Sequence, residues 1–377
     1  MPYYERALPM LEIPRAFSLD DLDRARPDRP YLVARDHPGF TPLVWLQSPP
    51  TMMGERYRDA IAEDPHIRCL LHANAVEVSM DAGGRHATGI RMGTLGGRGA
   101  SVAAKRYVLC AGAIENARLL LLSDSVVPGG IGNGHDLVGR CFMTHFGVGG
   151  TLALVAFEDG GTFREEALIQ HRPGLSEHVF GWTTNAALRG RLGLLGCSIN
   201  AWVAGTEPTR PSVPPAIDAL LAHGSRARIR TRAHVLAILG EQAPHRESRI
   251  SLSNELDALG QRRAVVDLRF REDDLRSLRQ SVEAFAAVLA RRGVGRVRLE
   301  HEDVLESRFA PDHHMGTTRM AADPRSGVTD AAGRVHGVDN LYVGGSSLFP
   351  TSGFANPTLT IVALALRQAD QLRYSMP

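Results

Sequence analysis

The chain has 377 residues, of which 44% are hydrophobic and 22% charged, and its formal net charge is +2. This length allows two or three domains with a large core, and the small net charge excludes a general attraction to nucleic acid or to an anionic membrane. No apolar run reaches the roughly 18 residues of a membrane-spanning helix, so no membrane span is expected.

The first 50 residues are rich in proline and charge, and they predict an N-terminal surface segment with one short helix. We place that helix at residues 19–26, because Ser18 is a suitable N-cap and Pro27 would end it. A second helix is predicted at residues 53–61. Strands separated by glycine-containing turns are then expected at residues 67–72, 75–80, 86–91 and 101–104.

A short apolar run, a glycine and an apolar helix follow one another at residues 107–122. Residues 107–110 predict a strand, Ala111 and Gly112 a turn, and residues 114–122 a helix. This order forms half of a nucleotide-binding crossover. An ordinary strand–helix turn without a ligand has the same pattern, so the local sequence leaves both interpretations open.

Alternating apolar and polar residues between positions 145 and 270 predict an antiparallel sheet that is open to solvent on one face. The segments 152–156 and 197–203 are its clearest strands, and 248–252 and 264–270 are expected to extend it.

An amphipathic helix is predicted next, with Asp273 or Asp274 as its cap and Gly293 at its end. Its apolar face is formed by Leu275, Leu278, Val282, Phe285 and Leu289. The chain then finishes with a strand at 340–343 and a helix at 357–372.

Two segments near the C-terminus carry side chains suited to chemistry. The run His313-His314-Met315-Gly316-Thr317 is followed, 43 residues after His313, by Asn356-Pro357-Thr358. An imidazole is a good general base because its pKa lies near working pH, and the N–H groups at a helix start attract an anion. Taken singly, however, His313 fits an ordinary structural histidine, and Asn356 followed by proline fits a plain N-cap.

Together with residues 340–351, these segments resemble the C-terminal signature of the glucose–methanol–choline (GMC) family of FAD-dependent oxidoreductases. The resemblance implies that His313 is the base that removes the hydroxyl proton of an alcohol or sugar while hydride passes to the flavin. It makes Asn356 the second hydrogen-bonding partner of the substrate oxygen. His314 is expected to support the loop and to be the alternative base.

The resemblance also implies a set of residues that contact FAD. Tyr107 to Ser123 resembles the segment that passes the adenosine half of FAD, and the backbone of Val76 is expected to meet the adenine. Gly345 stands where many members carry aspartate, a variant closer to bacterial sugar and polyol dehydrogenases. The expected cofactor-binding residues are Val76, Ala111, Gly112, Gly345, Ser346, Asn356, Pro357 and Thr358.

The predicted fold class is therefore α/β plus α+β. Residues 51–145 and 305–377 would form a partial, Rossmann-like FAD-binding domain of the GMC type. Residues 146–304 would form an inserted antiparallel-sheet domain that binds substrate, and residues 1–50 the N-terminal surface segment.

The family's dinucleotide-binding turn, Gly-x-Gly-x-x-Gly, does not occur in this sequence; the glycines of residues 130–134 and 147–150 have the wrong spacing. That turn brings the backbone to the pyrophosphate at a helix N-terminus. The alternative to an active oxidoreductase is therefore a truncated or split-subunit fragment that binds no FAD alone, with a separate N-terminal FAD-binding polypeptide as its partner. A truncated reading frame, a split enzyme and a decayed gene are the three origins that we consider. A nicotinamide dehydrogenase would need its own complete turn.

Other site types have little support in the sequence. The cysteines, at positions 69, 110, 141 and 197, include no Cys-x-x-Cys pair, so we expect buried free thiols and no metal site. The alternating arginines 226, 228, 230 and 232 lack interleaved aromatic residues and predict a solvated face. Because the first residues lack the layout of a signal peptide, a cytoplasmic localisation is the default expectation.

Overall fold

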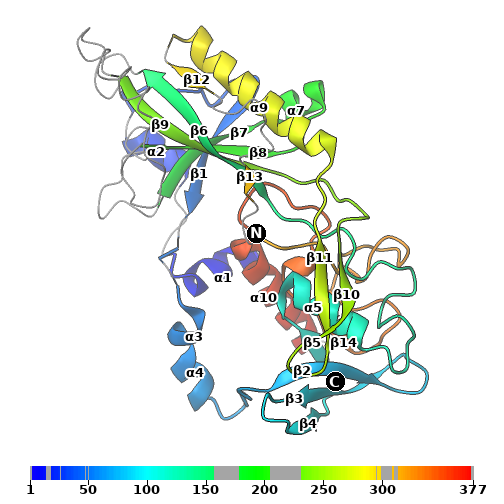
Figure 1. Cartoon of the computed structure of the whole chain (residues 1–377). Coiled ribbons are helices and arrows are strands. Elements are labelled where there is room, and N and C mark those ends of the chain that lie inside the picture. Colours follow the sequence, from blue (N-terminus) through cyan, green and yellow to red (C-terminus); the bar gives the residue numbers. More distant parts are fainter. Residues whose placement is uncertain are drawn as a thin grey trace.

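The computed structural model describes residues 2–13, 18–25, 27–46, 48–49, 51–156, 178–203, 231–293, 295–298, 308–309 and 313–374. In these residues the chain forms two bodies, one above the other in Figure 1. We call the upper one the sheet body, after its large antiparallel sheet, and the lower one the crossover body, after its strand–turn–helix crossover. No helix in these residues is long and apolar enough to cross a membrane.

The sheet body is built on seven strands in the order β1-β7-β8-β9-β6-β12, with β13 also paired to β6. Among the strand side chains that the structure describes, those in the core of this body are Phe40, Phe146, Phe180, Trp182, Cys197, Ile199, Leu236 and Ile238. The strands are β1 (Phe40–Leu46), β6 (Phe146–Ala156), β7 (His178–Thr184), β8 (Cys197–Val203), β9 (Thr231–Gly240), β12 (Arg296–Arg298) and β13 (Arg308–Phe309).

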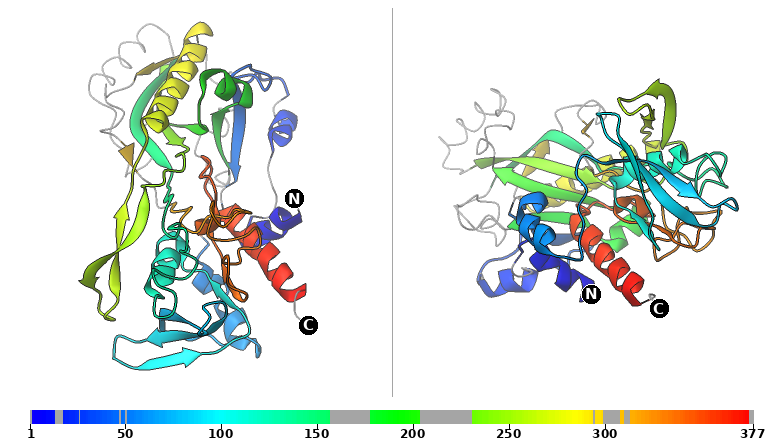
Figure 2. Two further views of the ribbon diagram at one scale, coloured as in Figure 1. Left: turned by 90° about the vertical axis from the view of Figure 1, so that its right-hand side faces the viewer. Right: turned by 90° about the horizontal axis from the view of Figure 1, so that it is seen from below.

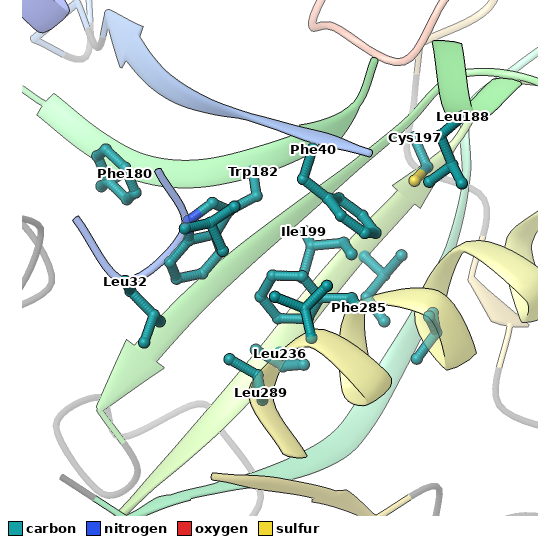
Figure 3. Packing of buried hydrophobic residues seen from close by; sticks show 14 of the residues in the cluster. Leu32, Phe40, Phe180, Trp182, Leu188, Cys197, Ile199, Leu236, Phe285 and Leu289 are labelled. Carbon is teal, nitrogen blue, oxygen red and sulfur yellow. The ribbon is translucent and has the colours of Figure 1, made fainter. Parts of the chain in front are cut away.

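Helix α9 (Glu272–Arg291) covers one face of this sheet (Figure 1). Its predicted apolar face is buried at Leu278, Val282, Phe285 and Leu289 and packs with Phe40 and Trp182 of the strands (Figure 3). Its N-cap is Arg271, three residues before Asp274, whose Oδ2 accepts the Arg271 N–H at 2.8 Å. The predicted end at Gly293, with φ of 69°, is confirmed.

The structure differs from the expected surface segment at residues 1–50. Leu32, Val33 and Phe40 are buried in the core of the sheet body, and β1 is the edge strand of its sheet. Pro42 counts against a strand in the sequence, because proline cannot donate a ladder hydrogen bond. On an edge strand proline is nevertheless tolerated, since no ladder hydrogen bond is lost there. Helix α1 (Pro2–Met10) instead packs beside α10 (Thr358–Tyr374), as both views of Figure 2 show.

The short helices that follow are partly as predicted. Helix α2 (Leu19–Ala25) begins as expected, because Ser18 and Asp21 exchange hydrogen bonds at its start. The predicted helix at 53–61 is divided at Tyr57 into α3 (Met53–Arg56) and α4 (Arg58–Glu63). A further short helix, α7 (Ala186–Leu192), lies between β7 and β8 and is capped by Asn185.

The strand predicted at residues 67–72 is wrong. Residues 67–70 form no regular secondary structure, and Ile67, Leu70 and Leu71 are 48%, 51% and 76% exposed. An apolar run forms a strand only where a neighbouring strand pairs with it, and no described strand does so here.

The crossover body contains the predicted strand, turn and helix. Strands β5 (Tyr107–Leu109) and β14 (Leu341–Val343) form a parallel pair, and α5 (Gly112–Leu122) follows β5. A 3-10 turn, η1 (Ser346–Leu348), follows β14. The three-stranded sheet of β2 (Asn74–Met80), β3 (Ala87–Gly93) and β4 (Gly99–Val102) lies below them (Figure 1).

The hairpin of β10 (Arg249–Leu256) and β11 (Arg262–Asp267) does not extend the large sheet, as the sequence had predicted, but forms a sheet of its own. It packs on α5 instead: Ile250 is fully buried in the same cluster as Leu120. Arg118 of α5 forms an ion pair with Asp257 of the hairpin at 2.6 Å. Alternation alone specifies a half-buried strand and not the element that covers it.

Candidate active site

The Gly-Thr segment after His313 is held by contacts from three directions. Gly316 has φ of 90°, and a Cβ at this position would lie 2.4 Å from the carbonyl oxygen of Cys141, so only glycine fits. The Thr317 hydroxyl donates to the carbonyl of Ala113 at 2.6 Å, and the Thr318 N–H donates to Ser347 at 2.9 Å. The segment is thereby attached to the start of α5 and to the loop after β14.

Two histidines meet beside this segment. Met143 and Met315 form an isolated antiparallel bridge with two N–H···O bonds of 2.9 Å. Continuing that register by two residues places His145 opposite His313. Their Nδ1 atoms lie 3.1 Å apart, and their rings meet edge to face with centroids 5.0 Å apart.

His145 is fully buried, and its Nε2 lies 3.4 Å from the carbonyl oxygen of Ser352. Burial, assisted by the nearby His313, lowers the pKa of His145 to about 4, and the Ser352 carbonyl opposes the shift. His145 is therefore neutral at neutral pH. No pattern in the sequence marks His145 as a site residue, because only the tertiary bridge brings two histidines 168 positions apart into contact.

His314, the alternative base, points to a different neighbour. Its ring packs on Phe142 with centroids 5.4 Å apart, and its carbonyl accepts a hydrogen bond from the Ser346 hydroxyl at 2.6 Å. These contacts fit the predicted role of His314 in supporting the loop, and they link the histidine segment to a predicted cofactor-binding residue.

The interpretation of Asn356 as an N-cap is wrong by one residue. The first helical bond of α10 runs from Ile361 N–H to the carbonyl of Pro357 at 2.9 Å, which makes Pro357 the cap. Asn356 precedes it and is exposed, and its side chain caps no N–H within the described residues. Its amide is therefore available for a ligand.

A cavity of about 290 Å³ opens beside Asn356, just below the roughly 300 Å³ at which typical ligand pockets begin. The loop before α10 provides one wall, and the sheet body provides the other through Gly196, Glu241 and Arg189. The Glu241 carboxylate accepts the Gly196 N–H at 2.9 Å. Arg189 had no signal in the sequence, because only the tertiary fold places α7 opposite this loop.

The predicted cofactor-binding residues at the start of α5 face open space. Ala111 and Gly112 are exposed. Gly112 and Gly345 have φ of 79° and 93°, and a Cβ on either would meet no described heavy atom within 4 Å. Asn116 connects their two segments, since its side chain accepts from Ala111 N–H at 2.8 Å and donates to the carbonyl of Gly344 at 3.1 Å. Backbone that no side chain covers allows a cofactor such as FAD to approach closely.

Val76, the remaining predicted cofactor contact, lies elsewhere on the crossover body. It occupies a β-bulge, because Ala75 pairs with Met92 and Glu77 with Arg91. The next residue but one, Val78, donates to Ser123 at the C-terminal end of α5. The structure therefore places Val76 and Gly112 at opposite ends of α5, roughly 16 Å of helix apart.

Two further expectations concern residues outside the site. Cys141 and Cys197 are buried free thiols as predicted, whereas Cys69 and Cys110 are exposed, which corrects that part of the prediction. Arginines 226, 228 and 230 lie outside the described residues, and Arg232 is in β9. No cluster of three or more potential metal ligands occurs in the described parts of the chain.

A family model described as GMC oxidoreductase matches residues 244–365. The fructose dehydrogenase large subunit of Gluconobacter japonicus is 30% identical over 283 residues, covering 72% of this chain and 47% of that protein. The 6'''-hydroxyparomomycin C oxidase of Streptomyces lividus is 27% identical over 322 residues, covering 81% and 52%. The chain thus spans about half the length of the curated relatives it matches.

Solved structures share the fold. Pyridoxine 4-oxidase from Mesorbium loti superposes with a TM-score of 0.51 at 19% identity, covering 81% of this chain and 58% of that one. A variant of formate oxidase from Aspergillus oryzae gives a TM-score of 0.57 at 15% identity and covers 99% and 70%. The predicted fold class is confirmed by these similarities.

Proposed function

Because this chain belongs to the GMC family of FAD-dependent oxidoreductases, we propose that it forms the substrate-binding and proton-accepting part of an enzyme that oxidises a CH–OH group. One observation supports this most directly. The Gly-Thr segment after His313 is hydrogen-bonded to both α5 and the loop after β14. It lies beside Gly112 and Gly345, where an added Cβ would have no described heavy atom within 4 Å. The proposed base therefore lies close to the proposed cofactor surface.

In this proposal each residue has one task. His313 takes the hydroxyl proton of the substrate, and Asn356 donates a hydrogen bond to the same oxygen. FAD, when bound, supplies the acceptor for the hydride that leaves the carbon. The backbone N–H groups at the start of α10, near Pro357 and Thr358, stabilise negative charge that develops on the acceptor. Gly112 and Gly345 allow the backbone to approach the cofactor closely.

The proposed substrate is a sugar, polyol or small alcohol. The cavity beside Asn356 is polar at Glu241 and Arg189, both able to hydrogen-bond hydroxyl groups. Relatives named as a fructose dehydrogenase, a paromamine 6'-oxidase and a 2-methyl-1,2-propanediol dehydrogenase support this class of substrate, since each name specifies a hydroxyl compound.

We propose the same division into domains as the sequence suggested, with two changes in membership. Residues 51–145 and 305–377 would bind FAD, and residues 146–304 would bind substrate. Strand β1 belongs with the large sheet, because it pairs with β7 along its whole length. The β10–β11 hairpin belongs with the FAD-binding part, because it packs on α5.

The second candidate is a fragment that needs another polypeptide to bind FAD. Parallel strands are normally part of larger sheets covered on both faces, yet β5 and β14 form a pair by themselves in the described residues. Val108 in β5 is 38% exposed, and Cys110 after it is exposed too. A polypeptide bearing a Gly-x-Gly-x-x-Gly turn would cover this surface.

The test is the visible absorption spectrum of the purified chain after incubation with FAD and gel filtration. Flavin absorption that remains with the protein, and is bleached by an alcohol or sugar without oxygen, supports the oxidoreductase. A colourless protein that gains flavin only when co-expressed with a polypeptide bearing the turn supports the second candidate. A chain that stays colourless in both experiments contradicts the proposed cofactor role.

A further inference from the structure

We propose that His145 is a positioning residue that holds His313 in the tautomer with its proton on Nδ1 and its lone pair on Nε2. This inference rests on the proposed function, in which His313 is the base. It adds a second histidine to the site and names the nitrogen of His313 that accepts the substrate proton.

The contact between the histidines fixes a relation between their protons. The two Nδ1 atoms are 3.1 Å apart, a hydrogen-bonding distance. One proton occupies that bond, so one Nδ1 donates it and the other accepts it. A neutral imidazole has one N–H and one acceptor nitrogen, so the partner of the other nitrogen decides which role each ring has.

For His145, the partner of the other ring nitrogen is the backbone carbonyl of Ser352. Its oxygen faces Nε2 of His145 at 3.4 Å, and a carbonyl oxygen only accepts hydrogen bonds. The proton of neutral His145 therefore lies on Nε2, and its Nδ1 is the acceptor. It follows that Nδ1 of His313 is the donor.

The surroundings keep both Ser352 and His145 in these roles. The Ser352 hydroxyl accepts from the Gln242 N–H and donates to the Gln242 carbonyl, both at 3.0 Å. The neighbouring Thr144 N–H donates to the Gln242 side chain at 3.0 Å. Complete burial and the adjacent His313 both disfavour a charged His145. His145 thus remains a neutral acceptor at working pH.

This arrangement suits a base that must become a cation. When the substrate O–H bond breaks, a new N–H bond forms at Nε2 of His313, while the electron pair of the C–H bond leaves as hydride for the bound FAD. The resulting imidazolium keeps its Nδ1–H bond to the neutral ring of His145. No second proton transfer is needed, and the positive charge has an acceptor already in place.

The first experiment is ¹⁵N NMR of the full chain with labelled histidines, with the His313 signals assigned by their loss in His313→Gln. The chain has 15 histidines, so this assignment by difference is essential. We expect Nδ1 of His313 to be protonated and Nε2 unprotonated at neutral pH. His313 in the Nε2–H tautomer would overturn the proposal, and this result requires neither FAD nor turnover.

Two substitutions at His145 provide the matched comparison. In His145→Asn, the amide oxygen takes the place of Nδ1 as an acceptor, so His313 should keep its tautomer. In His145→Leu the acceptor is lost, and the two tautomers should become mixed. His336, which contacts the carbonyl of Ala321 away from this pair, is the control, since His336→Ala should leave the His313 signals unchanged. Equal spectra for the Asn and Leu variants would contradict the positioning role.

Flavin reduction in the FAD-loaded enzyme separates the two proposals. We expect His145→Leu to lower kcat by about 10-fold or more, with a smaller change in KM and with partial recovery in His145→Asn. The loss is bounded by the about 10²–10⁴ that a complete base contributes. If His313 has the expected tautomer but His313→Ala reduces flavin normally, the base assignment fails while the positioning of His313 by His145 stands.

Discussion

At the scale of single residues, the proposed chemistry depends first on His313. Its position is set by backbone contacts of the following residues, so removing its ring leaves the loop in place. In the FAD-loaded enzyme, we expect His313→Ala to retain its flavin and to slow flavin reduction by about 10²–10⁴. Stopped-flow absorbance under substrate excess measures this rate. An unchanged rate would remove His313 from the mechanism.

A substitution at Asn356 distinguishes a structural role in capping α10 from a functional role in substrate binding. Because Pro357 takes the first helical hydrogen bond of α10, Asn356→Ala should change the free energy of unfolding by no more than about 0.5 kcal/mol. Turnover should fall, since a hydrogen bond to the substrate oxygen is lost. Urea unfolding and steady-state kinetics on the same preparation test both parts. A stability loss of about 0.5–2 kcal/mol with normal turnover would restore the N-cap interpretation.

His145 makes stability depend on pH. Its pKa is about 4 in the folded chain, against 6.5 for an unperturbed imidazole. Between these values the unfolded state binds a proton that the folded state does not. The contribution of neutral His145 is therefore complete above about pH 6.5 and is lost as pH falls toward 4, by an amount on the order of 3 kcal/mol.

The corresponding measurement is urea unfolding at pH 7 and at pH 4.5. His145→Asn does not titrate in this range, so its loss of stability between the two pH values should be smaller by about 2–3 kcal/mol than that of the unmodified chain. Identical pH dependence in both proteins would show that burial of His145 does not disfavour its charged form.

At the scale of elements, Gly316 shows how closely two segments pack. A methyl group there would meet the Cys141 carbonyl in a conformation that already has positive φ. We expect Gly316→Ala to lower the free energy of unfolding by about 1–3 kcal/mol. Gly54, which has open space around its Cα and no positive φ, provides the control: Gly54→Ala should not destabilise. Equal effects at the two sites would contradict a steric role for Gly316.

The elements predicted correctly are those whose signal is local. The strand and helix on either side of Gly112 were expected, because an apolar run, a glycine and a helical pattern follow each other directly. Helix α9 was expected from the spacing of Leu278, Val282 and Phe285. The strand at residues 67–72 failed because pairing depends on a partner, and the β10–β11 hairpin packed elsewhere because alternation does not name its neighbour.

At the scale of the whole molecule, the two bodies have separate cores. Phe285 and Trp182 belong to the cluster of the sheet body, and Leu120 and Ile250 belong to that of the crossover body, with no shared residue. The histidine pair lies where segments of both parts meet, because His145 immediately precedes β6 and Ser352 is bonded to Gln242 after β9. The candidate site therefore depends on how the bodies join.

Separate cores predict separate effects of core substitutions. Phe285→Ala should destabilise the sheet body by about 3–5 kcal/mol and lower the protection of its amides from hydrogen exchange. Amides of α5 in the crossover body should be much less affected. Exchange measured by mass spectrometry on peptides from both bodies tests this. A uniform loss of protection would show that the two cores unfold as one unit.

The sequence by itself indicated the fold class and a resemblance to one family, and it located most helices and strands, because motif spacing, apolar periodicity and capping residues act over short distances along the chain. The place of His313 and Asn356 in the family signature also made them the predicted site residues. Only the tertiary structure decided that His145 contacts His313, that Pro357 and not Asn356 caps α10, and that Glu241 and Arg189 face Asn356 across a cavity. These contacts join residues that are far apart in sequence or depend on exact register, and no local pattern encodes such distances.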